Sequence, residues 1–160
     1  MTYISQIGFL GTKAFFYTDI VLVYIIMLPF LMLFSIWFVM KHQYILHKVT
    51  QFLLFFITLG MLLLFYYEMY VSKVFDDLLI IGNTDSTQSF YFFLFHLIII
   101  LVTFILWKST ILFGSADKKR RALPGLYSRS HKTAGKRVMI GIVFLSFSLG
   151  ILYKMLYVVA

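Results

Sequence analysis

Four long stretches of the chain consist almost entirely of apolar residues, and most polar residues lie between them. The stretches cover residues 20–40, 49–71, 90–107 and 138–159, and an extension of the third to residue 113 also fits the pattern. Each is about 18–23 residues long, enough for an α-helix to cross a hydrocarbon layer of about 30 Å. Backbone groups in lipid must form their hydrogen bonds within the segment, so each stretch predicts a transmembrane helix. We therefore predict an all-α fold, in which residues 1–160 form one membrane domain, a bundle of four transmembrane helices.

The composition of the chain leads to the same conclusion. Hydrophobic residues make up 62% and charged residues 12% of the 160 positions, whereas soluble domains average about 45–50% and about 25%. A soluble domain of this length could not bury so much apolar surface, so the predicted surroundings are a lipid bilayer. The chain has no cysteine, which excludes disulfides, thiolate metal sites and cysteine nucleophiles.

The net charge of +8 is distributed unevenly along the chain. Eleven of the fourteen Lys and Arg residues lie between the first two spans or in the basic loop 108–137. Because basic loops remain on the cytoplasmic side, we predict that both connections are cytoplasmic and that both termini face outward. Asp19 is counted among the charges of the outer side. The basic loop suits anionic lipid headgroups, and it lacks the interleaved aromatic residues of a nucleic-acid surface, so we expect no nucleic-acid partner.

Polar residues inside a predicted span are informative because lipid makes them costly. His96 and Thr103 are seven residues apart, so they share a helical face that we expect to point into the bundle. Glu68, near the outer end of the second span, is a candidate partner for His96. Such a contact is either a proton-exchanging or ligand-binding pair, or a hydrogen bond that fixes the packing.

A second polar group lies at the predicted cytoplasmic end. His47 and Gln51 share a face at the start of the second span, and His131 precedes the fourth span. These two spans start on the same side of the membrane, so His47 and His131 are predicted to come close. The pair could ligate a haem iron or, with His42 as a third ligand, copper or zinc. The alternative is a set of interfacial histidines that bind water, headgroups or Gln51.

Two further features concern packing. Pro29 removes one backbone hydrogen bond from the first span and is expected to kink it. Ser146 and Gly150 have the spacing of small residues that let helices approach closely. Catalytic triads, phosphate-binding loops and facing carboxylates are absent from the sequence, so we predict no enzymatic activity.

Several short motifs occur in a characteristic order along nearly the whole chain. They are Gly8-Phe-Leu-Gly-Thr-Lys-Ala14, His47-Lys-Val-Thr-Gln51, Tyr91 with His96, Arg129-Ser-His131-Lys-Thr-Ala-Gly135-Lys-Arg137, and Ser148-Leu-Gly-Ile-Leu-Tyr153 followed by Met155-Leu-Tyr157. In order and spacing this pattern resembles the domain-of-unknown-function 420 family of small four-span bacterial membrane proteins. The stretch around Glu68 fits the family pattern only loosely.

The resemblance implies a protein of the bacterial cytoplasmic (inner) membrane whose partners are other membrane subunits of a respiratory complex. It also implies an accessory or assembly role in the maturation of a haem–copper respiratory oxidase. His47, His96 and His131 match the family pattern and thereby become candidates for handling haem, copper or quinone. The alternative function is a redox subunit that binds b-type haem or quinone between its helices, because histidines occur on several helices of a four-helix bundle.

Overall fold

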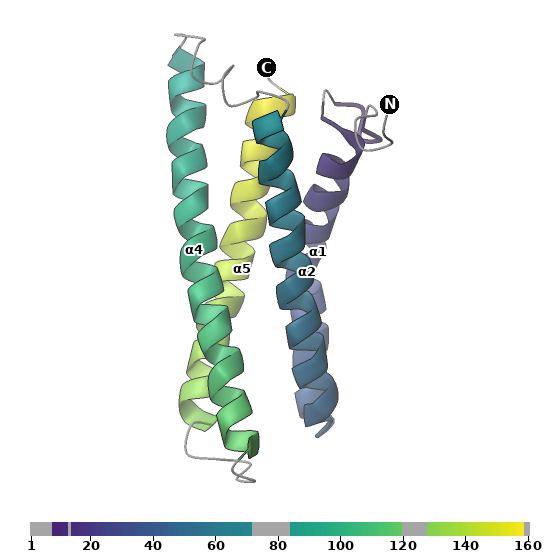
Figure 1. The fold of residues 1–160 in the computed structure, drawn as a ribbon, viewed down its shortest axis with the longest axis vertical. Helices are drawn as coiled ribbons and strands as arrows, with labels where there is room; N and C mark the ends of the chain where they lie inside the picture. Colours follow the sequence, from purple (N-terminus) through teal and green to yellow (C-terminus); the bar gives the residue numbers. More distant parts are fainter. Residues whose placement is uncertain (1–7, 13, 72–83, 120–127, 159–160) are drawn as a thin grey trace.

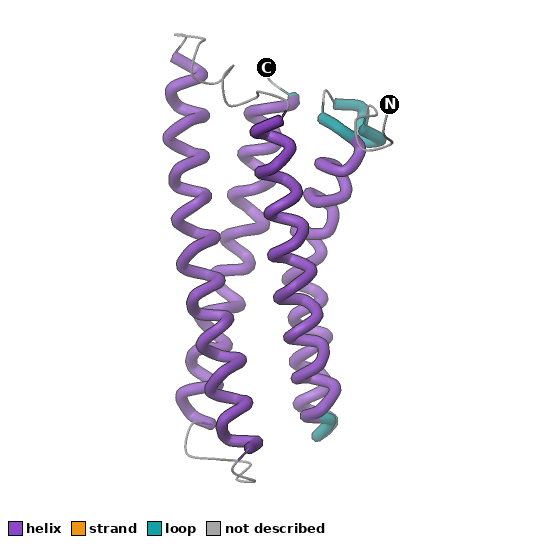
Figure 2. Tube along the Cα trace, viewed as in Figure 1, coloured by secondary structure: helices purple, strands orange, loops and turns teal. Residues whose placement is uncertain are grey.

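The structure, a computed structural model, describes residues 8–12, 14–71, 84–119 and 128–158 as an antiparallel helical bundle (Figure 1). Its helices are α1 (Phe16–Met40), α2 (Tyr44–Val71), α4 (Thr84–Lys119) and α5 (Ser128–Tyr157). The other described residues form short turns, and the described part contains no β-strand (Figure 2). The predicted all-α bundle of four helices is therefore confirmed.

All four helices are long and apolar enough to cross a membrane. Their outward faces carry large apolar side chains, such as Leu63, Phe147 and Tyr70, with 62%, 69% and 78% of their surface exposed. An exposed apolar surface of this extent is unfavourable in water and suits lipid tails. The chain is thus a multi-pass membrane protein.

The helices are longer than the apolar stretches that predict them. The first helix begins at Phe16 instead of residue 20, and the second begins at Tyr44 instead of residue 49. α4 continues to Lys119 and α5 begins at Ser128, so much of the predicted loop 108–137 is helical. Hydropathy marks only the lipid-crossing part of a helix, whereas Lys, Arg and Ala are good helix formers that extend it into the headgroup region.

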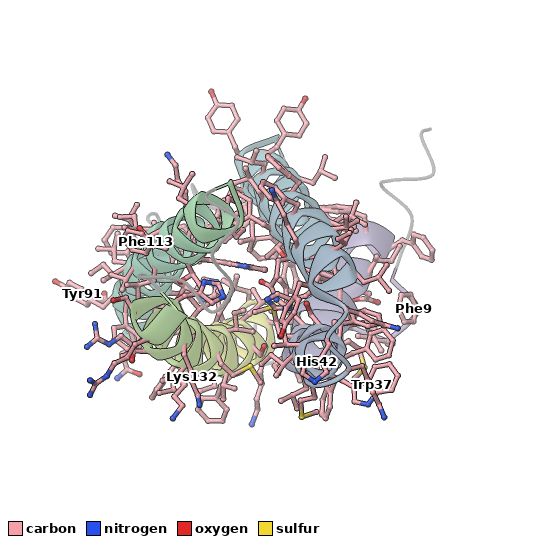
Figure 3. All side chains as sticks on the ribbon, turned by 90° about the horizontal axis from the view of Figure 1, so that it is seen from below. Phe9, Trp37, His42, Tyr91, Phe113 and Lys132 are labelled. Atoms are coloured by element: carbon pink, nitrogen blue, oxygen red, sulfur yellow. The ribbon has the colours of Figure 1, made fainter. Side chains whose placement is uncertain are left out.

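The helices pack as two pairs, α1 with α2 and α4 with α5, and the contact between α1 and α5 joins the pairs. α4 packs most extensively against α5, α1 packs against both α2 and α5, and α2 meets α4 over a short stretch. The start of α1 and the end of α5 lie at the same end of the bundle (Figure 1). The opposite end, where α1 meets α2 and where α4 ends and α5 begins, is termed the basic end. Figure 3 views the molecule from this side.

A proline inside α1 explains one contact between α1 and α5. Pro29 has no N–H, so the carbonyl of Ile25, one turn earlier, lacks its usual helical partner. The Ser146 hydroxyl on α5 donates a hydrogen bond of 2.6 Å to this carbonyl oxygen. Because an unpartnered carbonyl is costly in lipid, Ser146 restores the bond that Pro29 removes. Ser146 was predicted to act as a small packing residue, and the structure adds this hydrogen bond.

Another small residue of α5 packs closely against α4. A Cβ atom on Gly141 would lie 2.6 Å from Oγ1 of Thr103, so Thr103 would have to move to admit a side chain. A Cβ on Gly150 would meet no atom within 4 Å. Gly141 therefore permits the close contact of α4 with α5, whereas Ser146 of the predicted pair contacts α1.

We predict that Ser146→Ala lowers the free energy of unfolding by about 0.6 kcal/mol, with ~1.7 kcal/mol as the upper figure, because the Ile25 carbonyl loses its partner. In a Pro29→Ala background the helix supplies its own N–H, so the same serine substitution should cost less. Denaturant unfolding in mixed micelles measures both costs. An equal cost in the two backgrounds would contradict the link between Pro29 and Ser146.

The orientation predicted from the basic residues can be tested with cysteines, because the chain has none of its own. Ser130 and Val158 are both exposed, at opposite ends of α5. In intact cells a membrane-impermeant maleimide should label Val158→Cys, and it should label Ser130→Cys only after permeabilisation. The opposite pattern of labelling would show that the basic end faces outward.

Candidate functional site

His47 lies in the first turn of α2, half-buried at the basic end. Its Nδ1 atom is 2.9 Å from the carbonyl oxygen of Ser35 and 3.1 Å from the Ser35 hydroxyl oxygen. A carbonyl oxygen can only accept a hydrogen bond, so we assign the proton of the neutral ring to Nδ1. The Nε2 atom of His47 then keeps its lone pair, which is the form that binds metals.

His47 belongs to a polar network that joins three helices. Gln51 donates from Nε2 to the Ser35 hydroxyl oxygen at 3.0 Å, and Trp107 donates from Nε1 to Oε1 of Gln51 at 2.8 Å. Ser35, Gln51 and Trp107 are all buried. We use the name polar network for Ser35, His47, Gln51 and Trp107. It links α1, α2 and α4 and fixes the start of α2, whereas the sequence indicated only His47 and Gln51.

His131 is held in the same way from the other side. Its Nδ1 atom is 2.9 Å from the carbonyl oxygen of Thr110 on α4, so we assign its proton to Nδ1 as well. Its ring rests on Gly114, where an added Cβ would lie 2.9 Å from Cε1 of the imidazole. Any side chain at position 114 would therefore displace the ring, and the glycine is required for this placement of His131.

The two imidazoles lie next to each other, as the sequence predicted. The ring centroids of His47 and His131 are 6.4 Å apart, and the ring planes are nearly perpendicular. Within the described part of the chain, neither Nε2 atom has a hydrogen-bond partner. We refer to His47 and His131 as the histidine pair. Their role as ligands remains a prediction.

His42 lies apart from the histidine pair. It has a φ of 57° in the turn between α1 and α2, and its exposed ring contacts the hydroxyl of Tyr44 at 3.2 Å. Figure 3 shows it on the outside of the bundle. The described residues include no group of three His, Cys, Asp or Glu side chains that could hold a metal ion. The three-histidine arrangement considered from the sequence is therefore not formed there.

His96 is completely buried between α4 and α5. The Ser148 hydroxyl oxygen is 2.8 Å from Nδ1 of His96 and 3.1 Å from the Leu145 carbonyl oxygen. The Nε2 atom of His96 has no partner in the described structure. The predicted burial of His96 beside a polar residue is confirmed. The side chain of Glu68 lies outside the described residues, so its contact with His96 remains a prediction.

Asp19, which the sequence counted among the charges of the outer side, lies in the first turn of α1 and is enclosed by other residues of the chain. Asp19 is fully buried, and its carboxylate accepts hydrogen bonds from the Leu10 N–H at 2.8 Å and from the Tyr153 hydroxyl. The Tyr153 oxygen is also 2.6 Å from Oγ1 of Thr12. In the sequence, the feature that could have indicated this burial is the position of Asp19 directly before an apolar run. Because the helix begins at Phe16, Asp19 lies within the helix and needs a hydrogen-bond partner inside the protein.

Comparisons of the chain with protein-family models, with curated proteins and with solved structures gave no match. The resemblance described above therefore depends on the quoted motifs alone.

We predict that Asp19→Asn lowers the free energy of unfolding by about 1.5–3 kcal/mol, the range for hydrogen bonds to charged groups. The asparagine amide keeps one acceptor oxygen, but its NH₂ group then faces either the Leu10 N–H or the Tyr153 hydroxyl, which are both donors to Asp19. Tyr153→Phe should cost less, since the carboxylate keeps the Leu10 bond. Unfolding in mixed micelles measures both, with Tyr67→Phe on the exposed face as the control. Equal stability of Asp19→Asn and the control would contradict the role of the carboxylate.

Proposed function

We propose that the protein is an accessory or maturation factor of a haem–copper respiratory oxidase in the bacterial cytoplasmic membrane, with membrane subunits of that complex as its partners. The observation that carries the proposal is the histidine pair. Its rings are 6.4 Å apart, each Nδ1 atom is bonded to a backbone carbonyl, and each Nε2 atom is left without a hydrogen bond in the described structure. This is the arrangement of neutral imidazoles that metal sites use.

The motifs of the resemblance support the proposal from a second direction. Four of them contribute to contacts between different helices: His47 and Gln51 in the polar network, His96 in its bond to Ser148, His131 in the histidine pair, and Tyr153 in the bond to Asp19. A shared motif that serves tertiary contacts indicates a shared fold. The link to oxidase maturation comes from the family resemblance and is part of the proposal.

The arrangement of the described polar residues favours an accessory role over an enzyme. In the described part of the chain, the buried acid Asp19 is engaged by Leu10 and Tyr153, and no carboxylate contacts either member of the histidine pair. A histidine pair without a neighbouring acid suits the holding and release of a ligand better than the transfer of protons.

Deletion of the gene in a bacterium that carries it should lower the amount of mature haem–copper oxidase, measured as oxygen uptake and as the oxidase absorption spectrum of the membranes. The wild-type chain and His42→Ala should restore both, whereas His47→Ala and His131→Ala should not, since each removes one of the two Nε2 atoms. Immunoblots of the membranes control for insertion of each variant.

Normal oxidase spectra and oxygen uptake in the deletion strain would overturn the proposed function. The redox-subunit alternative gives a different result, because the detergent-purified protein would then carry a reducible Soret band or a bound quinone. Co-purification of oxidase subunits without a chromophore would instead support the accessory role.

A further inference from the structure

The separation of the histidine pair matches the size of one metal ion. A metal–imidazole bond is about 2 Å long, so two rings on opposite sides of a single ion have centroids roughly 6 Å apart. The observed distance between the two centroids is 6.4 Å. Each Nδ1 atom is bonded to a carbonyl on its own side, Ser35 on α1 for His47 and Thr110 on α4 for His131. The Nε2 atoms are the two nitrogens that remain available to an ion.

The groups around the pair would hold the rings in this position without an ion. Carbonyl partners at Nδ1 fix both the tautomer and the ring orientation of metal-binding histidines. Gly114 leaves the space that the His131 ring occupies. The buried bond from Trp107 to Gln51 fixes the helical turn that carries His47. The site is thus preformed by the fold.

The number of ligands restricts the ion. Within the described residues, no third His, Cys, Asp or Glu side chain joins the two imidazoles. Zinc sites use three or four protein ligands, and copper(II) prefers a square-planar set of nitrogen and oxygen atoms. Copper(I) accepts two imidazoles in line.

The groups beside the pair favour a bare ion over a haem. The polar network fills the interior beneath the pair, and Gly114 is in contact with the ring of His131. A macrocycle between the rings would have to separate α2 from α5.

We propose that His47 and His131 bind a single copper(I) ion in two-coordinate geometry, half-buried at the basic end of the bundle. The inference rests on the proposed function, because a haem–copper oxidase must receive copper. It identifies copper(I) as the ion that the histidine pair binds. Binding forms two bonds from the Nε2 lone pairs to the ion, with no change in oxidation state. Both histidines are half-buried, so an ion reaches them from the headgroup region.

The test is a titration of the detergent-purified protein with copper(I), under anaerobic reducing conditions, against a chromophoric copper(I) chelator. One ion per chain should bind, and X-ray absorption should show two nitrogen neighbours at about 2 Å. His47→Ala and His131→Ala should each abolish this binding, and His42→Ala should bind as the wild type does. The chain has no cysteine, so thiols do not contribute to the signal.

A second variant tests the geometry with both ligands retained. Gly114→Ala places a methyl group 2.9 Å from the His131 ring and should weaken copper(I) binding by about 10–100-fold, the usual cost of disturbing a group that orients a ligand. Gly135→Ala is the matched control, since its Cβ would meet nothing within 4 Å. Circular dichroism and gel filtration confirm that both variants remain folded.

Three results would overturn the copper(I) site. The first is folded wild-type protein that does not take copper(I) from the chelator, and the second is an X-ray absorption spectrum dominated by methionine sulfur. The third is a haem in the purified wild-type protein that is absent from His47→Ala. Equal affinities of Gly114→Ala and Gly135→Ala would also contradict it. The proposed function fails separately. Copper(I) binding by the purified chain together with a normal oxidase in the deletion strain would keep the site and reject the oxidase role.

Discussion

The structure depends on one constraint of the lipid environment, namely that a polar group inside the bundle is costly unless it finds a hydrogen-bond partner. The polar network meets this requirement for α1, α2 and α4 at one level, through Ser35, Gln51 and Trp107. Because Gln51 is bonded to residues of two neighbouring helices, α2 cannot shift along its axis or rotate without losing bonds that lipid does not replace. The position of His47, one turn before Gln51, follows from this. The interaction that stabilises the bundle therefore also places a ligand side chain.

α4 is the common reference for both members of the histidine pair. One face of this helix carries Trp107, Thr110 and Gly114, at spacings of three and four residues. Trp107 donates the bond to Gln51, and the Thr110 carbonyl accepts the bond from His131. Gly114 leaves the space for the His131 ring. One turn and three turns before Trp107, Thr103 and His96 continue the same face against Gly141 and Ser148 on α5. The distance between the histidines is thus set by adjacent turns of one rigid helix, although the two residues belong to α2 and α5.

Periodicity and connectivity account for what could be predicted from the sequence. The apolar runs located the four spans, the antiparallel order brought His47 and His131 to the same end, and the spacing of seven residues placed His96 and Thr103 on one face. The partners could not be predicted. Ser35 and Trp107 look like ordinary residues of an apolar run, and their bonds depend on the rotation of each helix about its axis, which hydropathy does not contain. The burial of Asp19 could not be predicted for a related reason, because the helix begins four residues before the apolar run.

The three polar levels of the bundle differ in what remains available to a ligand, and this difference locates the chemistry. At the end near the termini, Asp19 has both carboxylate oxygens engaged by Leu10 and Tyr153, so it serves to hold the segment before α1. In the middle, His96 has a nitrogen without a described partner, but the side chain is completely enclosed. At the basic end, the histidine pair combines unengaged nitrogens with partial exposure. A ligand needs both a binding atom and a path to it, and of these three levels only the histidine pair offers the two together.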